Sequence, residues 1–294
     1  MEFLLGEVKK TLKFYSIFSF SLTPLEVYKN LGVKCKFIEV VSALEELCNI
    51  GEVIEYSGYF YLSGSESLRD IRSARFLISI KKIKRARLVA YIISKLPFIR
   101  FIGICNSLGF LNAREDSDID FFIITKSGYL WTARFFGVFL LKLFKMRPEK
   151  NNLKDKICLS FFISDKNLDI SDVSLSGEDP YLYRWLSWIM PVYDDGIYQD
   201  FINKNIWIKK FLPNFIWQNN YLVNDKSYLK TFFENIFDGL EQILEKIQLK
   251  IMPSNLLKAR ERRDNSVVMN DKMLKLHLID RRAEYRKKLN IYDK

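Results

Sequence analysis

The sequence is poor in the residues that build soft-metal sites and disulfide frameworks. Its 294 residues include one histidine, His277, and four cysteines without a CxxC motif or another spacing typical of metal ligands. Each cysteine lies in an apolar stretch, which indicates buried free thiols in a reducing compartment. The pattern excludes a disulfide-stapled fold. His277 has no partner motif and is interpreted as a structural residue.

Long apolar runs are also missing. The most apolar stretch, residues 135–141, follows Arg134 and ends at Lys142, so it is far shorter than a membrane span. The chain opens with Glu2, Glu7 and several lysines, which is the wrong pattern for a signal peptide. We therefore expect a cytoplasmic protein that has no membrane partner.

The net charge of +11 is spread unevenly along the chain. Residues 1–64 and 101–249 each have a net charge of −2, whereas residues 65–100 have +8 and residues 250–294 have +7. Basic clusters attract polyanions through counterion release, so nucleic acid is a candidate partner of the two basic segments. The alternative is that these segments are ordinary solvated helix faces.

The segment most informative about function is residues 104–125, ICNSLGFLNAREDSDIDFFIIT. It contains a small-residue turn at Asn106 and Ser107, and two carboxylates, Asp118 and Asp120, directly before an apolar run. Side chains at positions i and i+2 of a strand point to the same face, so these carboxylates should converge. Such a pair predicts a magnesium site, because Mg²⁺ takes one or two carboxylates together with substrate phosphates.

An acid-x-acid pair alone is weak evidence, since a chain of this composition contains about four by chance. The surroundings distinguish this pair from a chance one, because the strand-like segment 98–105 runs into the turn and ten residues separate Ser107 from Asp118. In this arrangement residues 97–165 resemble the DNA polymerase beta-type nucleotidyltransferase superfamily, which has a Gly-Gly or Gly-Ser turn followed by Asp-x-Asp or Asp-x-Glu in an apolar strand. Asn106 stands where the family usually has glycine, and asparagine tolerates left-handed backbone geometry. The alternative is a solvated acidic turn before a core strand.

The resemblance implies a role for each residue of the motif. Asn106 and Ser107 would bind nucleotide phosphates through backbone N–H groups and the Ser107 hydroxyl. Asp118 and Asp120 would hold Mg²⁺, with Mn²⁺ as the alternative metal, to neutralise charge on the transferred phosphoryl group. The implied activity is transfer of a nucleoside monophosphate from an NTP to a hydroxyl group.

Residues 1–64 are predicted to form a winged helix-turn-helix domain. Helices are expected over residues 8–18, from the N-cap Thr23 onward and over residues 37–48, and a hairpin with a Ser-Gly turn follows at 53–62. The third helix, in the recognition position, contains three glutamates, whereas duplex binding requires cations for phosphates. A protein-contact or positioning role is favoured over DNA reading.

The remaining segments complete a prediction of the α+β class. Residues 65–96 are interpreted as a basic helical linker, and residues 97–175 as the nucleotidyltransferase core, a mixed sheet with flanking helices. Residues 176–294 are interpreted as a helical C-terminal region, with helices expected over 181–190, 195–210 and 227–249. Four tryptophans there could stack on bases, but helical spacing is more typical of core residues: Trp185, Trp188, Trp207 and Trp217.

A third carboxylate normally completes the family's metal site, and none occupies the expected position here. The next strand-like segment, residues 157–165, has Ser160 at its central polar position. Asp165 becomes the third ligand only if the strand register brings it over the site; otherwise it is a strand-ending turn residue. The missing acid favours an alternative function, in which a catalytically impaired fold serves as a winged-helix regulator or a scaffold that binds nucleic acid or protein.

Overall fold

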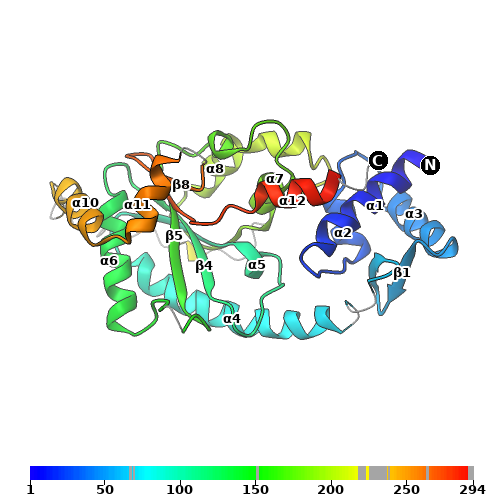
Figure 1. Cartoon of the computed structure of the whole chain (residues 1–294), viewed down its shortest axis with the longest axis horizontal. Coiled ribbons are helices and arrows are strands. Elements are labelled where there is room, and N and C mark those ends of the chain that lie inside the picture. The colour runs from blue at the N-terminus through cyan, green and yellow to red at the C-terminus, as the bar shows by residue number, and fades with distance from the viewer. Residues whose placement is uncertain are drawn as a thin grey trace.

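The structure is a computed structural model that describes residues 1–290 except 66–67, 69, 150–151, 218–222, 225–236, 238 and 263–264. The molecule is elongated, with the N-terminal helices at one end and a large sheet with its covering helices at the other (Figure 1). Among the described residues, no helix combines the length and the apolar character that crossing a bilayer requires.

The N-terminal unit, residues 1–64, consists of three helices and a hairpin. The helices are α1 (Glu2–Ser16), α2 (Pro24–Asn30) and α3 (Phe37–Asn49), and the antiparallel strands are β1 (Val53–Tyr56) and β2 (Tyr59–Leu62). The predicted capping box of α2 is confirmed, since the Thr23 hydroxyl accepts from the Glu26 N–H and the Glu26 carboxylate accepts from the Thr23 N–H.

Within the described residues, a mixed sheet of seven strands forms the centre of the molecule, in the order β7-β6-β3-β4-β5-β9-β8. β4 and β5 are parallel and are joined by the crossover helix α6 (Leu130–Leu143), as expected for parallel neighbours. β3 is antiparallel to both β4 and β6, and β5 is antiparallel to β9. The strands are β3 (Ile99–Ile104), β4 (Ile119–Thr125), β5 (Ile157–Ser164), β6 (Met190–Asp194), β7 (Val223–Asn224), β8 (Val267–Met269) and β9 (Met273–Leu276).

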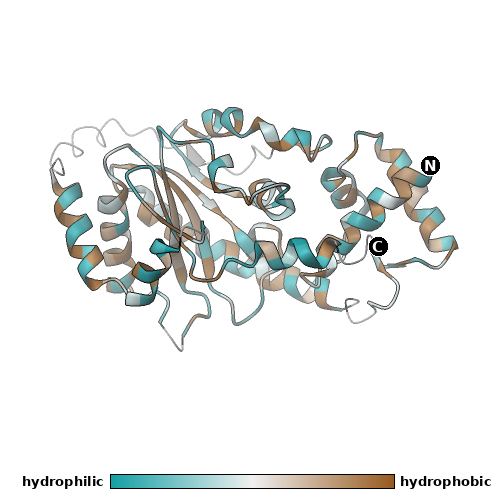
Figure 2. Cartoon of the chain, turned by 45° about the horizontal axis from the view of Figure 1, so that its top comes forward, coloured by the Kyte–Doolittle hydropathy of each residue, from teal (hydrophilic) through white to brown (hydrophobic). Residues whose placement is uncertain are grey.

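Helices cover both faces of this sheet, because its central strands are apolar on both sides. Ile119, Phe121 and Ile123 of β4 belong to the core on the side of α4 and α6, whereas Phe122 and Ile124 belong to the core on the side of α7 and α8. The apolar strands between more polar helices are visible in Figure 2. The remaining helices are α4 (Ile71–Ser94), α5 (Asn106–Gly109), α7 (Pro180–Trp188), α8 (Tyr198–Lys204), α10 (Leu240–Ile251), α11 (Ser254–Glu261) and α12 (Arg282–Asn290).

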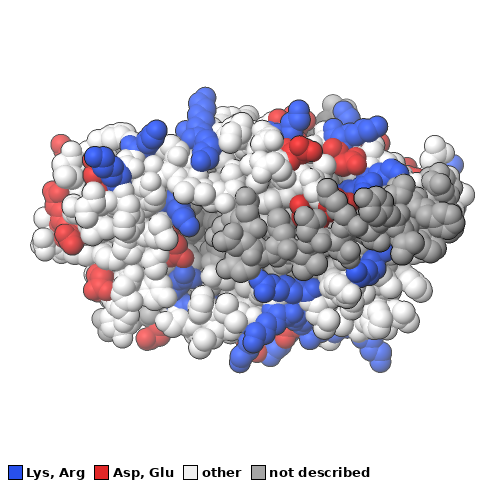
Figure 3. Space-filling model, turned by 180° about the vertical axis from the view of Figure 1, so that it is seen from behind, with Lys and Arg blue, Asp and Glu red and all other residues white. Residues whose placement is uncertain are grey.

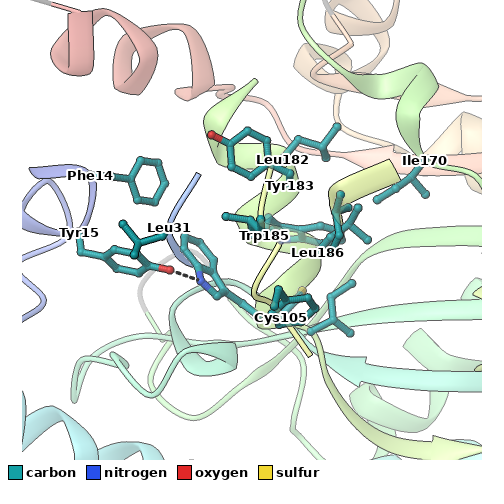
Figure 4. Close-up of a cluster of buried hydrophobic side chains, with 14 of the residues drawn as sticks. Phe14, Tyr15, Leu31, Cys105, Ile170, Leu182, Tyr183, Trp185 and Leu186 are labelled. Carbon is teal, nitrogen blue, oxygen red and sulfur yellow. Dashed lines mark hydrogen bonds between the residues drawn. The ribbon is translucent and has the colours of Figure 1, made fainter. Parts of the chain in front are cut away.

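The N-terminal unit shares its hydrophobic core with the sheet. Phe14 and Tyr15 of α1 are buried in the same cluster as Trp185 and Trp188 of α7 (Figure 4). The Trp188 indole N–H donates to the Tyr15 hydroxyl at 2.9 Å, which satisfies both polar groups within the cluster. The boundary drawn at residue 64 from the sequence therefore separates two groups of elements that pack as one body in this structure.

The α+β class and the mixed sheet are confirmed, but the helical assignment of residues 176–294 is wrong in part. β6, β8 and β9 come from this region and pair with the sheet. The helix expected over 195–210 is divided into α8 and a 3-10 segment, Ile206–Lys210. Of the helix expected over 227–249, residues 227–236 lie outside the described part of the chain, and α10 accounts for the end.

Candidate metal and nucleotide site

The two predicted carboxylates lie together at the start of β4. Asp118 precedes the strand and Asp120 is its second residue, so both side chains reach the same side of the sheet. Cys158 of β5 joins them: one ligand atom from each of the three side chains lies within 4.8 Å of the other two. Among the described residues, this is the only cluster of three His, Cys, Asp or Glu side chains close enough to bind one metal ion.

Cys158, not Ser160, occupies the position opposite Asp120. In the parallel ladder Asp120 is paired with Cys158 and Phe121 with Leu159, but Phe122 is paired with Phe161. Ser160 is thus the extra residue of a β-bulge, which shifts the register by one position. Ser160 is close enough to Cys158 to lower the pKa of its thiol, but it has no partner residue in the ladder with β4. The prediction that Ser160 takes the third position was wrong, because a bulge leaves no periodic signal in a strand that is apolar on both faces.

The three clustered side chains disfavour negative charge in the absence of a cation. Burial and the neighbouring Asp118 raise the pKa of Asp120 to about 7, although hydrogen bonds from Asn106 and Cys158 oppose the shift. Burial also raises the pKa of Asp118, against the lowering effect of the positive charges of Lys82 and Arg147. Burial and Asp120 raise the pKa of the Cys158 thiol to about 12. A divalent cation bound here would relieve this repulsion.

The small-residue turn follows β3 directly and borders the carboxylates. Asn106 adopts a left-handed backbone with φ of 55°, the geometry that asparagine tolerates and that glycine would adopt without strain. Its side-chain oxygen accepts a hydrogen bond from the Trp185 indole N–H at 2.8 Å, and Asn106 is close enough to the Asp120 carboxylate to lower its pKa. Ser107 is the next residue, partly exposed in the single turn α5. The structure therefore brings Asn106 and Asp120 into contact, with Ser107 adjacent.

Asp165 lies at the opposite end of β5 and is not near the cluster. Its carboxylate accepts from the Ser127 N–H at 2.9 Å, beyond the end of β4. It lies seven positions after Cys158 along an extended strand, a distance of roughly 20 Å. The register therefore excludes Asp165 as a third ligand. Its carboxylate instead accepts a hydrogen bond from the turn after β4.

Lys82 of α4 holds the segment that leads into the cluster. Its buried ammonium group donates to the Ser117 carbonyl at 2.8 Å and pairs with Asp155 at 2.7 Å. These contacts connect the residue before Asp118 to the loop before β5, so Lys82 positions the carboxylates from a distant part of the sequence. The basic character of α4 was visible in the sequence, but no local pattern distinguished Lys82 from its exposed neighbours.

A cavity of 200 Å³ opens beside Asn106 on the side of the sheet covered by α7 and α12. Trp185 forms part of its wall, and Tyr181 stacks on Tyr285 with ring centroids 5.5 Å apart. His277 also lines it, and burial followed by the charge of Lys275 lowers the pKa of His277 to about 4, so its ring is neutral at pH 7. Aromatic walls with a few polar groups suit a planar ring such as a nucleobase.

The other tryptophans and several cations have structural roles. Trp188 is buried, and Trp207 and Trp217 pack on the same core cluster. Three cations of the basic linker are also engaged. Arg72 pairs with Glu26 at 2.7 Å, Arg75 donates to the Phe18 carbonyl at 3.0 Å, and Lys82 is buried as described above. Lys81, Lys84 and Arg85 remain exposed.

Figure 3 shows Lys and Arg side chains along the edge of the molecule where α4 runs.

No family model, curated protein or solved structure matches this chain. A function for this chain must therefore be inferred from the geometry of its clustered residues.

Proposed function

We propose that the protein is a metal-dependent nucleotidyltransferase that moves a nucleoside monophosphate from an NTP to a hydroxyl group. The observation that supports this proposal is the convergence of Asp118, Asp120 and Cys158 within 4.8 Å, next to the left-handed turn at Asn106. Two carboxylates fit Mg²⁺ or Mn²⁺, since these ions also take oxygen ligands from substrate phosphates. On this proposal residues 97–175 form a polymerase beta-type core and residues 1–64 a winged helix.

In the proposed reaction the acceptor oxygen forms a bond to the α-phosphorus while the bond from that phosphorus to pyrophosphate breaks. The bound metal would neutralise the charge that develops on the phosphoryl oxygens. Asn106 and Ser107 would hold the phosphates, and the cavity next to Trp185 would hold the base. Asn106 would also keep Asp120 oriented, because its side chain connects that carboxylate to Trp185.

The nature of the third side chain predicts slow turnover. The acceptor hydroxyl must lose a proton, and in related sites a carboxylate at the third position helps to remove it. The Cys158 thiol, with its pKa raised to about 12, is protonated at pH 7 and cannot accept that proton. This observation favours the second candidate function, a nucleotide-binding regulator or scaffold in which catalysis is impaired.

Thermal unfolding tests nucleotide binding without knowledge of the acceptor. A ligand that binds only the native state raises its stability, so Mg²⁺ with ATP, CTP, GTP or UTP should raise the melting temperature of the parent by several degrees. Asp118→Asn and Asp120→Asn should abolish this shift while each variant still folds. The proposed site is wrong if both variants respond to Mg-NTP as the parent does.

A second measurement separates the two candidate functions. The four NTPs, labelled at the α-phosphate, are incubated with the parent and with cellular RNA, protein and small-molecule fractions. Label transferred to one fraction by the parent, but not by Asp120→Asn, supports the enzyme. Nucleotide binding without transfer to any fraction supports the regulator or scaffold.

A further inference from the structure

A second cavity, of 240 Å³, lies on the side of the sheet that α6 and α10 cover. It is bounded by α6, by the end of α10 and by the segment before β5. Three cationic side chains and one amide line it, and no acidic side chain does so among the described residues: Arg134, Lys142, Arg147 and Gln248. The other walls are apolar: Phe135, Val138, Phe139, Ile251, Met252 and Pro253.

Among the described residues, the two guanidinium groups of this cavity have no anionic partner. Arg134 donates to the Gln248 side-chain oxygen, a neutral acceptor, at 2.5 Å. The Nε of Arg134 and one Nη of Arg147 are buried and have no hydrogen-bond partner in the part of the chain that the structure describes. The fully buried Arg72 and Arg184 also have an Nε without a partner, but Arg72 pairs with Glu26 and the Arg184 guanidinium lies over the Phe14 ring.

Two half-buried cations, each with a buried nitrogen that lacks a partner, are costly to maintain without an anion. Burial, followed by repulsion from Arg147, lowers the pKa of Arg134 to about 10. An unpaired buried charge destabilises a fold unless a ligand compensates it. Cations placed in this way at a cavity wall indicate a site for an anion.

The position of the cavity relates it to the proposed reaction. β9 pairs with β5 only from Phe161 onward, so among the described residues no strand pairs with this edge of β5 at Cys158. Through this edge Arg147 is close enough to influence the pKa values of Asp118 and Cys158. The turn at Asn106, where the nucleotide phosphates would bind, lies on the β3 side of the same carboxylates. The carboxylates therefore stand between two candidate anion sites.

We propose that this cavity binds a phosphate group of the acceptor, so that the acceptor is a phosphate monoester with an apolar or aromatic body. The assignment to the acceptor depends on the proposed nucleotidyl transfer, whereas the binding of phosphate does not. Three cations favour a dianion over a carboxylate, and the planar forks of Arg134 and Arg147 match phosphate oxygens. The apolar walls would contact the remainder of the molecule.

Calorimetric titration with phenyl phosphate, at low salt and without metal or nucleotide, tests the proposal on the full chain. The parent should bind it more tightly than benzoate, a carboxylate of similar shape. Arg134→Gln and Arg147→Gln should each weaken binding at least tenfold, and Lys142→Gln less, because Lys142 is exposed. The matched control is Lys288→Gln, which removes one exposed positive charge on α12, far from the cavity, and should leave binding unchanged (Figure 1).

Melting temperature distinguishes a ligand site from a structural role. Without ligand, Arg147→Gln should melt at the same temperature as the parent or higher, since it removes a half-buried charge that has no anionic partner among the described residues. Its response to Mg-NTP should persist. The proposal is overturned if the parent binds no phenyl phosphate, if benzoate binds more tightly, or if Arg147→Gln binds phenyl phosphate like the parent. Phosphate binding without any response to Mg-NTP would contradict nucleotidyl transfer and leave the anion site intact.

Discussion

Cys158 faces Asp120 across the parallel ladder of β4 and β5, and one ligand atom of each side chain lies within 4.8 Å of the other. This pairing determines the chemistry available at the carboxylates. A protonated thiol is a much weaker ligand for a hard cation than a carboxylate, so the proposed site has two acidic ligands. Replacement of this one side chain therefore changes metal binding in a predictable direction.

Cys158→Asp should tighten Mg²⁺ binding, because it adds a third carboxylate next to Asp120. If an acceptor is bound, turnover should also rise, since the new carboxylate can accept the hydroxyl proton. Without metal the variant should be less stable than the parent, because three partly buried carboxylates repel one another. A Mg²⁺ titration monitored by calorimetry, together with denaturant unfolding with and without Mg²⁺, measures these effects.

Ser160→Asp is the matched comparison for Cys158→Asp. It introduces the same acid two residues along β5, within the bulge, and should not improve Mg²⁺ affinity. Equal gains in affinity from both substitutions would show that the bulge does not set the register in solution. Cys158→Ser keeps a small polar group and adds no charge. Because the two carboxylates remain the charged ligands, Mg²⁺ affinity should stay within about twofold of that of the parent.

The pH dependence of stability should reveal two opposing groups. The folded state raises the pKa of Asp120 to about 7. The contribution of Asp120 to the free energy of unfolding is therefore lost as the pH rises from 3.8 toward 7. The folded state lowers the pKa of His277 to about 4, so its contribution is lost as the pH falls from 6.5 toward 4. Between pH 4 and 6.5 the two effects nearly cancel.

Single substitutions should expose each slope. In Asp120→Asn the free energy of unfolding should rise with pH, relative to the parent, by up to about 1.4 kcal/mol per unit between pH 4 and 6.5. In His277→Gln it should instead fall as the pH rises toward 7. Urea unfolding at pH 4.5, 5.5 and 6.5 measures both, and parallel curves for the three proteins would refute the assignment.

Polyanion binding, if it occurs, should depend on the exposed cations of α4. Replacing Lys81, Lys84 and Arg85 by glutamine should weaken binding to single-stranded RNA and make its salt dependence shallower, by about one unit of slope for each phosphate that the variant no longer binds. The N-terminal unit, with its net charge of −2, should contribute little. Fluorescence anisotropy over a range of salt concentrations measures this, with Lys288→Gln as the control. An unchanged slope in the triple variant would exclude α4 from the interface.

Arg282 should be the most important ionic residue for stability in the C-terminal segment. It pairs with Asp179, the N-cap of α7, at 2.8 Å, and the two side chains are 6% and 3% exposed. Arg282→Met should reduce the free energy of unfolding by roughly 3 kcal/mol or more, because it leaves a buried carboxylate unpaired. Arg286→Met, which removes hydrogen bonds to two carbonyls at the surface, should cost less than about 1 kcal/mol. Equal melting temperatures for the two variants would show that the pair contributes little.

The sequence by itself determined the features that depend on neighbours in the chain. The capping box at Thr23, the left-handed turn at Asn106 and the shared face of Asp118 and Asp120 follow from local backbone geometry, and the structure has all three. The crossover from β4 to β5 was also predictable, since a parallel pair joined by one helix has few alternatives.

Only the tertiary structure decided which distant residues meet those carboxylates. The bulge that brings Cys158 opposite Asp120, and keeps Asp165 at the far end, arises from pairing between strands about forty residues apart. Lys82, Arg134 and Arg147 reach the same region from α4, from α6 and from the segment before β5. Their convergence depends on helix packing across the sheet, for which no spacing in the sequence provides a signal, because long-range contacts leave no local periodicity.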